Sequence, residues 1–403
     1  MRTILFPPHF GDRYDQSPVA DWLRAFAEWL KAMGYNETTQ KGHVMALRLV
    51  LERQPRLPPD ARFGAAELDP MFHSQIRPTQ FRHVRWAFEQ FLRSKKQWID
   101  RPRQSRHDRL LDSYREHLQG LLGLAPSTVS AKISFARQFL ESTCPIDDGP
   151  SRIGIADVER YIVRRSRQIG RGGLKNELAT VRSFLKFCAS KDICRSNLAE
   201  VDFSVKFVGD KPPRAIPWKH IRRLLDSIDR STPMGCRDHA ALHLMAHYGL
   251  RTGEITSITV DDLDLQASRL RVRQAKVKSI QVLPISKGTR QLLSHYLRVA
   301  RPKCGLPELF VSVQAPTVPF SRNAIAQAFR RHAERSGLPL RNSSPYGLRH
   351  AFANQLLERG VGMPAIGQLL GHRTIESTSQ YLRIHTSALR DVALPVPRME
   401  EAV

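Results

Sequence analysis

Three short strings near the end of the sequence combine residue types that can act on a phosphate. They are HYGLRTGEITSIT at 247–259, SPYGLRHAFANQLLERG at 344–360 and LLGHRTIESTSQYLRIH at 369–385. Displacement at a phosphodiester passes through a pentavalent phosphorus whose non-bridging oxygens carry extra negative charge, which fixed guanidinium groups such as Arg251 and Arg349 stabilise. Arginine stays charged and bonds two oxygens in a fork, which lysine does not. A phenol is a fair nucleophile and a fair leaving group, so these residue types suit phosphodiester transfer through a phosphotyrosine.

The order and spacing of these strings resemble the active-site boxes of the tyrosine recombinases, also called phage-integrase-type recombinases. In that family one arginine follows a short helix and a turn, an HxLRH-like box supplies a second, and a Leu-Gly-His triplet precedes the nucleophilic tyrosine. Here His372 precedes Tyr381 by nine residues, which is the family's spacing. The resemblance implies that Tyr381 is the nucleophile and that Arg251, Arg349 and His372 surround the phosphate. Neither a metal ion nor another cofactor is expected, and the phosphotyrosine stores the energy of the broken linkage without ATP.

In the same family, a lysine on a hairpin delivers a proton to the leaving 5′-oxygen. This sequence offers two lysines in the corresponding place. Counting back from Leu283-Pro284-Ile285, which resembles the family's Val-Pro-Leu, puts Lys276 at the general-acid position. Lys278 is the alternative, because hairpin lengths vary and strand registers slip easily.

Two further positions follow from the boxes. Glu254 lies three residues after Arg251, a distance at which a helical carboxylate can orient a guanidinium, and the family often has an acidic residue there. Tyr346 stands where many family members have the first histidine of the HxLRH box. A phenol with a pKa near 10 donates hydrogen bonds but is a poor base at neutral pH. The sequence therefore does not identify the group that takes the proton of Tyr381. His350 is also in the box, but its family role is structural and we do not assign it to catalysis.

Each of these residues taken alone has an ordinary structural explanation. One arginine among 63 Lys and Arg is usually solvated, and a lone histidine such as His372 more often caps a helix. Their joint occurrence in the family's order is what favours catalysis. A metal site at His239, His243 and His247, which share one helical face, is disfavoured because no HExxH context or acidic partner accompanies them. We expect that face to lie beside DNA.

The charge of the chain points to a polyanionic partner. The 403 residues carry a formal net charge of +25 and are 41% hydrophobic, so the chain is long enough for two or three packed domains. The excess of Lys and Arg is spread along the sequence instead of forming a tail. Such a surface suits DNA or RNA, because neutralised phosphates release counterions. A ribosome-like or membrane-surface role could use the same excess.

Cysteine spacing and the apolar runs indicate where the protein works. The five cysteines form neither CxxC pairs nor a zinc pattern, and they are typical of reduced thiols. The N-terminus has no long apolar core, and no window of about 18 apolar residues occurs. We therefore expect a soluble cytoplasmic protein, associated with the nucleoid and not with a membrane.

The first 200 residues have helical periodicity and contain an internal repeat. Apolar residues recur at helical spacing from Val19 to Glu52, where Gly34 breaks the run and Asn36 or Thr38 can cap the next helix, and again from Phe81 to Ile99. Gly34, Thr39, Val50, Leu51 and Glu52 have counterparts 89 positions later, and Phe88, Phe91, Ser94 and Lys95 have counterparts 96 positions later. The repeat indicates two copies of one helical module, although generic amphipathic helices produce part of such a pattern.

The pattern changes after this repeat. Gly and Pro in DFSVKFVGDKPPRAIPW mark a linker, and further helices follow. Leu270 and Val272, then Ile280, Val282 and Ile285, predict two strands of a hairpin around Lys276 to Ser279. The fold class is therefore mainly α and multidomain, with helical N-terminal modules and a mixed α+β catalytic domain holding a small antiparallel sheet. The expected divisions are an additional module at 1–105, a SAM-like core-binding domain at 106–203, a linker at 204–216, the catalytic domain at 217–388 and a tail at 389–403.

The resemblance also implies partners. In the family, the core-binding and catalytic domains clamp duplex DNA at a specific site, and four subunits form a synapse, in some cases with companion recombinases. Leu389, Val392 and Leu394 form an apolar stretch in the tail that could dock on a neighbouring subunit. The expected activity is that of a site-specific recombinase of the integrase or transposase type, carried by a mobile element. The alternatives are a topoisomerase-like or resolvase enzyme of the same chemistry, and a DNA-binding protein whose catalytic site has decayed.

Overall fold

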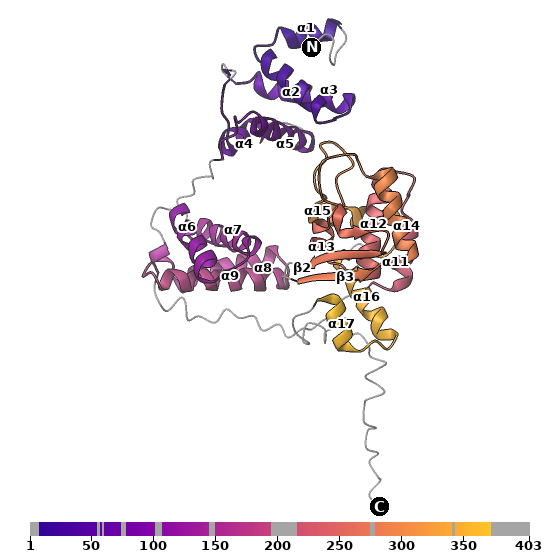
Figure 1. Ribbon diagram of the computed structural model, residues 1–403. Helices are drawn as coiled ribbons and strands as arrows, with labels where there is room; N and C mark the ends of the chain where they lie inside the picture. The colour runs from indigo at the N-terminus through magenta and orange to yellow at the C-terminus, as the bar shows by residue number, and fades with distance from the viewer. Residues whose placement is uncertain are drawn as a thin grey trace, which may run out of the picture. The chain divides into compact units, whose positions relative to one another are not determined.

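A computed structural model describes residues 8–54, 57–58, 60–73, 78–100, 107–144, 150–194, 216–274, 279–340 and 343–371 of the chain. Three successive stretches of these residues form the elements labelled in Figure 1. The first stretch is helical and comprises α1 (Pro8–Asp15), α2 (Ala20–Ala32), α3 (Glu37–Leu51), α4 (Ala65–His73) and α5 (Pro78–Ser94). The prediction of helices in the first hundred residues is confirmed.

Local capping explains where the helices of this stretch begin and end. Gly34, at a φ of +78°, follows the end of α2 in the left-handed region that glycine tolerates. The Asn36 side chain accepts a hydrogen bond from the backbone N–H of Thr39 at 2.8 Å, so Asn36 is the capping residue. α5 was expected to continue to Ile99 but ends at Ser94, because Lys96 has a φ of +58° and turns the chain.

The second stretch is also helical and has its own core. It comprises α6 (Asp108–Glu116), the π-helical η1 (His117–Leu121), α7 (Pro126–Thr143), the 3₁₀ turn η2 (Pro150–Arg152), α8 (Ile155–Gln168) and α9 (Arg171–Ala189). Buried Tyr114, Phe139 and Phe184 lie in one apolar cluster of these helices. Fully buried Glu177 on α9 receives two hydrogen bonds from Arg165 on α8, at 2.6 and 2.9 Å, and one from Tyr161. This ion pair fixes α8 against α9, and it lowers the pKa of Glu177 against the raising effect of burial.

Backbone details recur between the first two stretches at the offsets of the repeat. Gly34 and Gly123, 89 positions apart, both have positive φ, and so do Lys96 and Asp192, which are 96 positions apart. The Ser94 hydroxyl donates to the carbonyl of Phe91 at 2.6 Å, and Ser190 makes the equivalent bond to Phe187 at 2.8 Å. These matches support an internal duplication. The division at 1–105 and 106–203 stays a prediction.

The third stretch places a small sheet among helices. Its helices are α11 (Trp218–Asp226), α12 (Pro233–Tyr248), α13 (Thr252–Ser257), α14 (Lys287–His295), α15 (Arg322–Arg335), α16 (Tyr346–Glu358) and α17 (Met363–Leu370), with short turns η3 (Val260–Asp262) and η4 (Tyr296–Ala300). α12 is buried along most of its length, which explains why its sequence shows little amphipathic periodicity. The sheet is antiparallel in the order β1 (Leu263–Asp264), β2 (Arg269–Gln274), β3 (Ser279–Pro284). The mainly helical fold class with a small antiparallel sheet is confirmed (Figure 1).

The register of the hairpin differs in one respect from its sequence pattern. Gln274 pairs with Ser279, and Leu270 pairs with Leu283, so the predicted hairpin is confirmed in its two paired strands. Ile280 and Val282 are 66% and 52% exposed, whereas Leu283 is buried. Ile280 and Val282 therefore face away from the core, because the register puts Gln281 and Leu283 on the face of Leu270. Among the described residues, no helix combines the length and apolar character needed to cross a membrane.

Candidate active site

Arg251 is placed by a tight turn at the carboxyl end of α12. Gly249 ends that helix with a φ of +64°, and a Cβ built on it would lie 2.5 Å from Cδ1 of Phe352, so this position accepts only glycine. The chain then enters α13, with Arg251 as its N-cap residue. Glu254 accepts a hydrogen bond from the Arg251 backbone N–H at 2.8 Å and one from its Nη1 at 2.7 Å. The predicted pairing of Glu254 with Arg251 is therefore present.

Arg349 on α16 is 1% exposed, and it is among the largest fully buried side chains of the described residues. Its Nη1 donates to the carbonyl of Gly249 at 2.6 Å, and its Nη2 donates to the carbonyl of Leu370. Nη1 also lies 3.9 Å from Oε2 of Glu254. A buried guanidinium needs such acceptors, because its charge loses hydration on burial. These partners fix the orientation of Arg349.

The two arginines meet at the carboxyl end of α17. Nη2 of Arg251 lies 3.5 Å from the carbonyl oxygen of Gly371, the residue that follows α17, while Arg349 takes the carbonyl of Leu370. The last carbonyls of a helix have no intrahelical partner and form the negative end of the helix dipole, so cations are favoured there. Glu254 supplies one carboxylate for the two guanidinium groups, so the net charge of the three side chains is positive. Such an arrangement can stabilise the charge of a transferring phosphate.

Tyr346 begins α16 and is 48% exposed, so its phenol reaches solvent. Its ring packs edge-on against that of His350, with 4.3 Å between the ring centroids. Burial and the neighbouring Arg349 lower the pKa of His350 to about 4, so this imidazole is neutral at physiological pH. His350 is 6% exposed, which fits the structural role expected for it.

Three of the predicted site residues, and the alternative lysine, lie outside the described residues. Lys276 and Lys278 fall in 275–278, between the last residue of β2 and the first of β3. His372 and Tyr381 fall in 372–403, which begins directly after Gly371, and the apolar tail residues 389, 392 and 394 belong to the same segment. The structure thus brings together Arg251, Glu254 and Arg349, with Tyr346 on the same helix as Arg349.

The three histidines of α12 line a cavity of about 390 Å³, together with Trp218 and Phe352. The His243 and His247 rings stack with 4.2 Å between centroids, and Nε2 of His243 lies 2.9 Å from the Thr289 hydroxyl. Burial lowers the pKa of His239 to about 4 and that of His243 to about 3. His239 is 8% exposed and His247 is exposed, so this face is buried at one end only, and its place beside DNA stays a prediction. In the part of the chain that the structure describes, no three His, Cys, Asp or Glu side chains form a metal-binding group.

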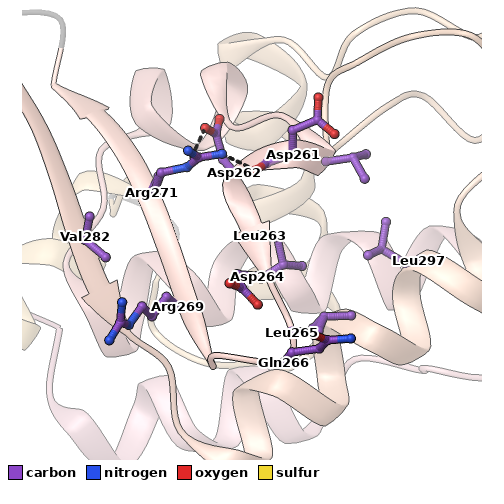
Figure 2. A pocket seen from close by; sticks show the side chains of 11 residues that line it. Asp261, Asp262, Leu263, Asp264, Leu265, Gln266, Arg269, Arg271, Val282 and Leu297 are labelled. Carbon is purple, nitrogen blue, oxygen red and sulfur yellow. Dashed lines mark hydrogen bonds and ion pairs between the residues drawn. The ribbon is translucent and has the colours of Figure 1, made fainter.

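A larger cavity, of about 630 Å³, lies beside the sheet, and residues of β1, β2, β3 and η4 line it (Figure 2). Arg271 on β2 donates to the carbonyl of Asp261 at 2.5 Å, and its Nε lies 3.7 Å from Oδ1 of Asp262. Val282 and Leu297 supply apolar walls. Among the described residues, no predicted site residue lines this cavity, and its lining holds three aspartates beside two arginines, so we do not assign it to the chemistry.

Sequence reasoning missed two glutamines that shape the site and the role of Gly249 as an acceptor for Arg349. Gly249 supplies both the turn and an acceptor for Arg349, and the signal was the Gly-Leu pair before Arg251. Gln274 and Gln281 face each other across the hairpin, with Nε2 of Gln274 2.6 Å from Oε1 of Gln281. A glutamine in an alternating strand gives no signal of its own, because it is equally common on a solvent face.

Comparison with known proteins identifies the family. Residues 215–387 match the model of the phage integrase family. The integrase/recombinase y4rF of Sinorhizobium fredii is 31% identical over 72% of this chain and 69% of its own length. The integrase/recombinase y4rA of the same organism is 28% identical over 96% of both chains. This chain belongs to the phage integrase family, the tyrosine-type site-specific recombinases.

Solved structures show the same fold. A lambda integrase dimer bound to a COC′ core site has a TM-score of 0.55 and 16% identity, covering 73% of this chain and 99% of that one. The Tn1549 transposon integrase in complex with circular intermediate DNA has a TM-score of 0.53 and 17% identity, covering 71% and 98%. At these identities the likeness concerns the fold. The y4rA match leaves at most a few per cent of either chain uncovered, so that relative also contains the additional N-terminal stretch.

Proposed function

We propose that this chain cleaves and rejoins DNA at specific sites through a covalent bond between Tyr381 and a 3′-phosphate. The observation that carries the proposal is the convergence of Arg251 and Arg349 on Glu254 and on the end of α17, one residue before His372. The family, the net charge of +25 and the DNA complexes of two structural neighbours support it.

The proposed reaction balances without a nucleotide cofactor. The Tyr381 hydroxyl gives its proton to water or to a neighbouring base and its oxygen attacks phosphorus, while Arg251 and Arg349 hold the non-bridging oxygens. The bond from phosphorus to the 5′-oxygen breaks, and Lys276, or Lys278 in its place, protonates that oxygen. A 5′-hydroxyl of the same or another strand then returns a proton to the lysine and attacks the phosphotyrosine. The bond from phosphorus to the Tyr381 oxygen breaks, and that oxygen takes a proton back. The guanidinium groups supply the positive charge, so the proposal includes neither a metal ion nor ATP.

A nicked suicide substrate tests this proposal. When the nick lies close to the scissile bond, the short released strand diffuses away and the covalent adduct accumulates. We expect an adduct with wild-type protein and none with Tyr381→Phe. The cognate site for the assay is obtained by mapping where Tyr381→Phe protein binds DNA. Absence of any adduct on that DNA would support the alternative of a decayed site.

The outcome of the chemistry is part of the proposal. We propose that this chain recombines two DNA sites in a tetrameric synapse, alone or with companion recombinases. We also propose that a mobile element encodes it. A two-site recombination assay run beside a supercoil-relaxation assay separates this outcome from a topoisomerase-like or resolvase activity. Relaxation without recombinant products would contradict it.

The additional N-terminal stretch is proposed to be a second DNA-binding or subunit-contact module. Its matched turns and serine bonds at the repeat offsets support this proposal, as does its presence in y4rA. Deletion of residues 1–100 is expected to weaken DNA binding or synapsis while adduct formation on a nicked site stays measurable. Unchanged recombination by the truncated protein would reject this role.

A further inference from the structure

The carboxyl end of α17 is held by three side chains from three other elements. The carbonyl of Leu370 accepts from Arg349, that of Gly371 accepts from Arg251 at 3.5 Å, and that of Leu369 accepts from Nε2 of Gln281 at 3.3 Å. These consecutive carbonyls belong to the helix end that lacks intrahelical donors. Two of the three donors are the proposed phosphate ligands. The third, Gln281, comes from β3 and has no part in the mechanism given above.

Gln281 is joined to a second glutamine, on β2. Nε2 of Gln274 donates to Oε1 of Gln281 at 2.6 Å, and Gln274 is 6% exposed. The two residues lie diagonally across the antiparallel pair, since Gln281 is opposite Val272 and Gln274 is opposite Ser279. A chain of hydrogen bonds therefore runs from Gln274, the last residue of β2, through Gln281 to the backbone of α17.

Gln274 also packs directly on Gly371. A Cβ built on Gly371 would lie 2.0 Å from Oε1 of Gln274, so no other residue fits there without displacing the glutamine. Gly371 has a φ of +59°, which glycine adopts at little cost. The hairpin and the end of α17 therefore touch through a hydrogen bond and through a close contact with a residue that has no side chain.

Both partners of this junction are neighbours of proposed catalytic groups along the chain. Lys276 follows Gln274 by two positions, Lys278 by four, and His372 follows Gly371 directly. A general acid has to lie within hydrogen-bond reach of the leaving oxygen, and a misplacement of about 1 Å can cost 10²-fold in rate. A fixed junction at Gln274 and Gly371 limits how far the hairpin shifts relative to the two arginines.

We propose that Gln274 and Gln281 are positioning residues that hold the hairpin carrying the general-acid lysine in register with Arg251, Arg349 and His372. This inference rests on the proposed function and deepens it. The two glutamines touch no substrate and act through the lysine. They therefore affect protonation of the leaving 5′-oxygen more than the attack by Tyr381, whichever of the two lysines supplies the proton.

Replacing the leaving oxygen by sulfur tests this inference. A nicked substrate with a 5′-bridging sulfur releases a thiolate, and a thiol with a pKa near 8.5 leaves without protonation far more readily than an alcohol. Gln281→Met and Gln274→Met keep the length of the side chain and remove its hydrogen bonds. We expect either variant to slow adduct formation on the oxygen substrate about 10-fold and to cleave the sulfur substrate within about 2-fold of wild type.

Three controls make the outcome decisive. Gln266→Met, at an exposed glutamine in the turn before β2, should change neither rate. Lys276→Met, or Lys278→Met if that lysine is the acid, should show the same pattern as the glutamine variants with a larger loss. The double variant Gln274→Met/Gln281→Met should be no slower than the worse single variant, because the two residues form one junction.

The ratio of sulfur to oxygen rates is taken within each preparation, so a partly misfolded variant does not alter it. Equal slowing of both substrates would mean that the glutamines only stabilise the fold, and no slowing of the oxygen substrate would mean that they position nothing; either result overturns the inference. Wild-type protein that forms an adduct with neither substrate overturns the proposed function, and with it the inference. If wild-type protein cleaves and the glutamine variants cleave the oxygen substrate as fast as wild type, only the inference is overturned.

Discussion

Oε2 of Glu254 accepts the backbone N–H of Arg251 at 2.8 Å and lies 3.9 Å from Nη1 of Arg349. One carboxylate therefore faces both arginines that the family resemblance assigns to the phosphate, although they come from helices almost 100 positions apart in the sequence. Glu254 is 6% exposed, so it contributes its charge where screening by water is weak. The proposed phosphate site thus contains a buried carboxylate that contacts both arginines.

Replacement of Glu254 by glutamine is expected to lower both stability and activity. The amide of the Glu254→Gln variant would keep one acceptor for Arg251 but lose the charge that balances Arg349, at a cost of about 1–3 kcal/mol. Adduct formation should fall roughly 10-fold because the guanidinium groups lose their fixed orientation. Urea denaturation and suicide-substrate kinetics measure the two effects. Glu358→Gln, on the exposed end of α16, is the matched control and should leave both unchanged.

Arg349→Lys is expected to reduce cleavage by about 10²-fold or more, the usual loss when a donor to a transition-state oxygen is removed. Lysine keeps the charge but not the fork that reaches the carbonyls of Gly249 and Leu370 together. Single-turnover rates on the nicked substrate measure the loss. Arg359→Lys, at an exposed position beyond the end of α16, serves as control, and a comparable loss there would undermine the assignment.

Tyr346→His is expected to speed adduct formation near neutral pH. The exposed phenol at the start of α16 is a poor base, whereas an imidazole with a pKa near 6.5 accepts a proton there. The rate of the variant should rise as pH increases through about 6.5 and then level off. A pH profile of wild type and variant tests this. A variant as slow as wild type at every pH would show that another group takes the proton of Tyr381.

Gly249→Ala is expected to destabilise the protein by roughly 2–4 kcal/mol. The substitution combines a left-handed backbone, which costs about 1–2 kcal/mol for other residues, with a clash against Phe352. Gly360→Ala isolates the backbone cost, because Gly360 has a φ of +77° and no atom within 4 Å of a built Cβ. Chemical denaturation should therefore show a clearly larger loss at 249 than at 360, and equal losses would contradict the packing argument.

Acid should destabilise the protein through its buried histidines. Burial lowers the pKa of His239 and His350 to about 4 and that of His243 to about 3, so these rings are neutral in the fold and take up protons near pH 6.5 when the chain unfolds. Their contribution to stability is complete above pH 6.5 and falls as the pH drops toward 4, by at most about 1.4 kcal/mol per histidine and pH unit. Denaturation at pH 7.5 and 5 measures the slope. His243→Gln should reduce it, and an unchanged slope would show that other groups carry it.

Much of this site follows from local spacing. Arg251 and Glu254 are three residues apart at a helix start, and the structure has them paired as expected. The hairpin was predictable from its flanking alternation, but not which alternate residues face the core. The pairing of Leu270 with Leu283 decides that, and it leaves Ile280 and Val282 in solvent. A shift of one residue in the register moves every side chain of a strand to the other face. An apolar pattern that continues past the strand does not determine the register.

The hydrogen-bond acceptors of Arg349 could not be predicted from the sequence. They are backbone carbonyls of Gly249, 100 positions away, and Leu370, 21 positions away. Every residue has a carbonyl, so no residue type marks these positions. The same holds for the junction of Gln274 with Gly371, where the informative feature is the absence of a side chain. Long-range contacts of a side chain with the backbone can be found only once the fold is known.

The hydrogen bonds that Arg251 and Arg349 make to the end of α17 have a consequence for how DNA is bound. Ordering a long side chain at an interface costs about 0.5–1.5 kcal/mol of conformational entropy. Here Arg251 and Arg349 are ordered when the protein folds, before any ligand binds. In the proposed reaction, the scissile phosphate therefore meets guanidinium groups whose orientation is already fixed. The free energy of its binding is then available for distinguishing the transition state from the ground state.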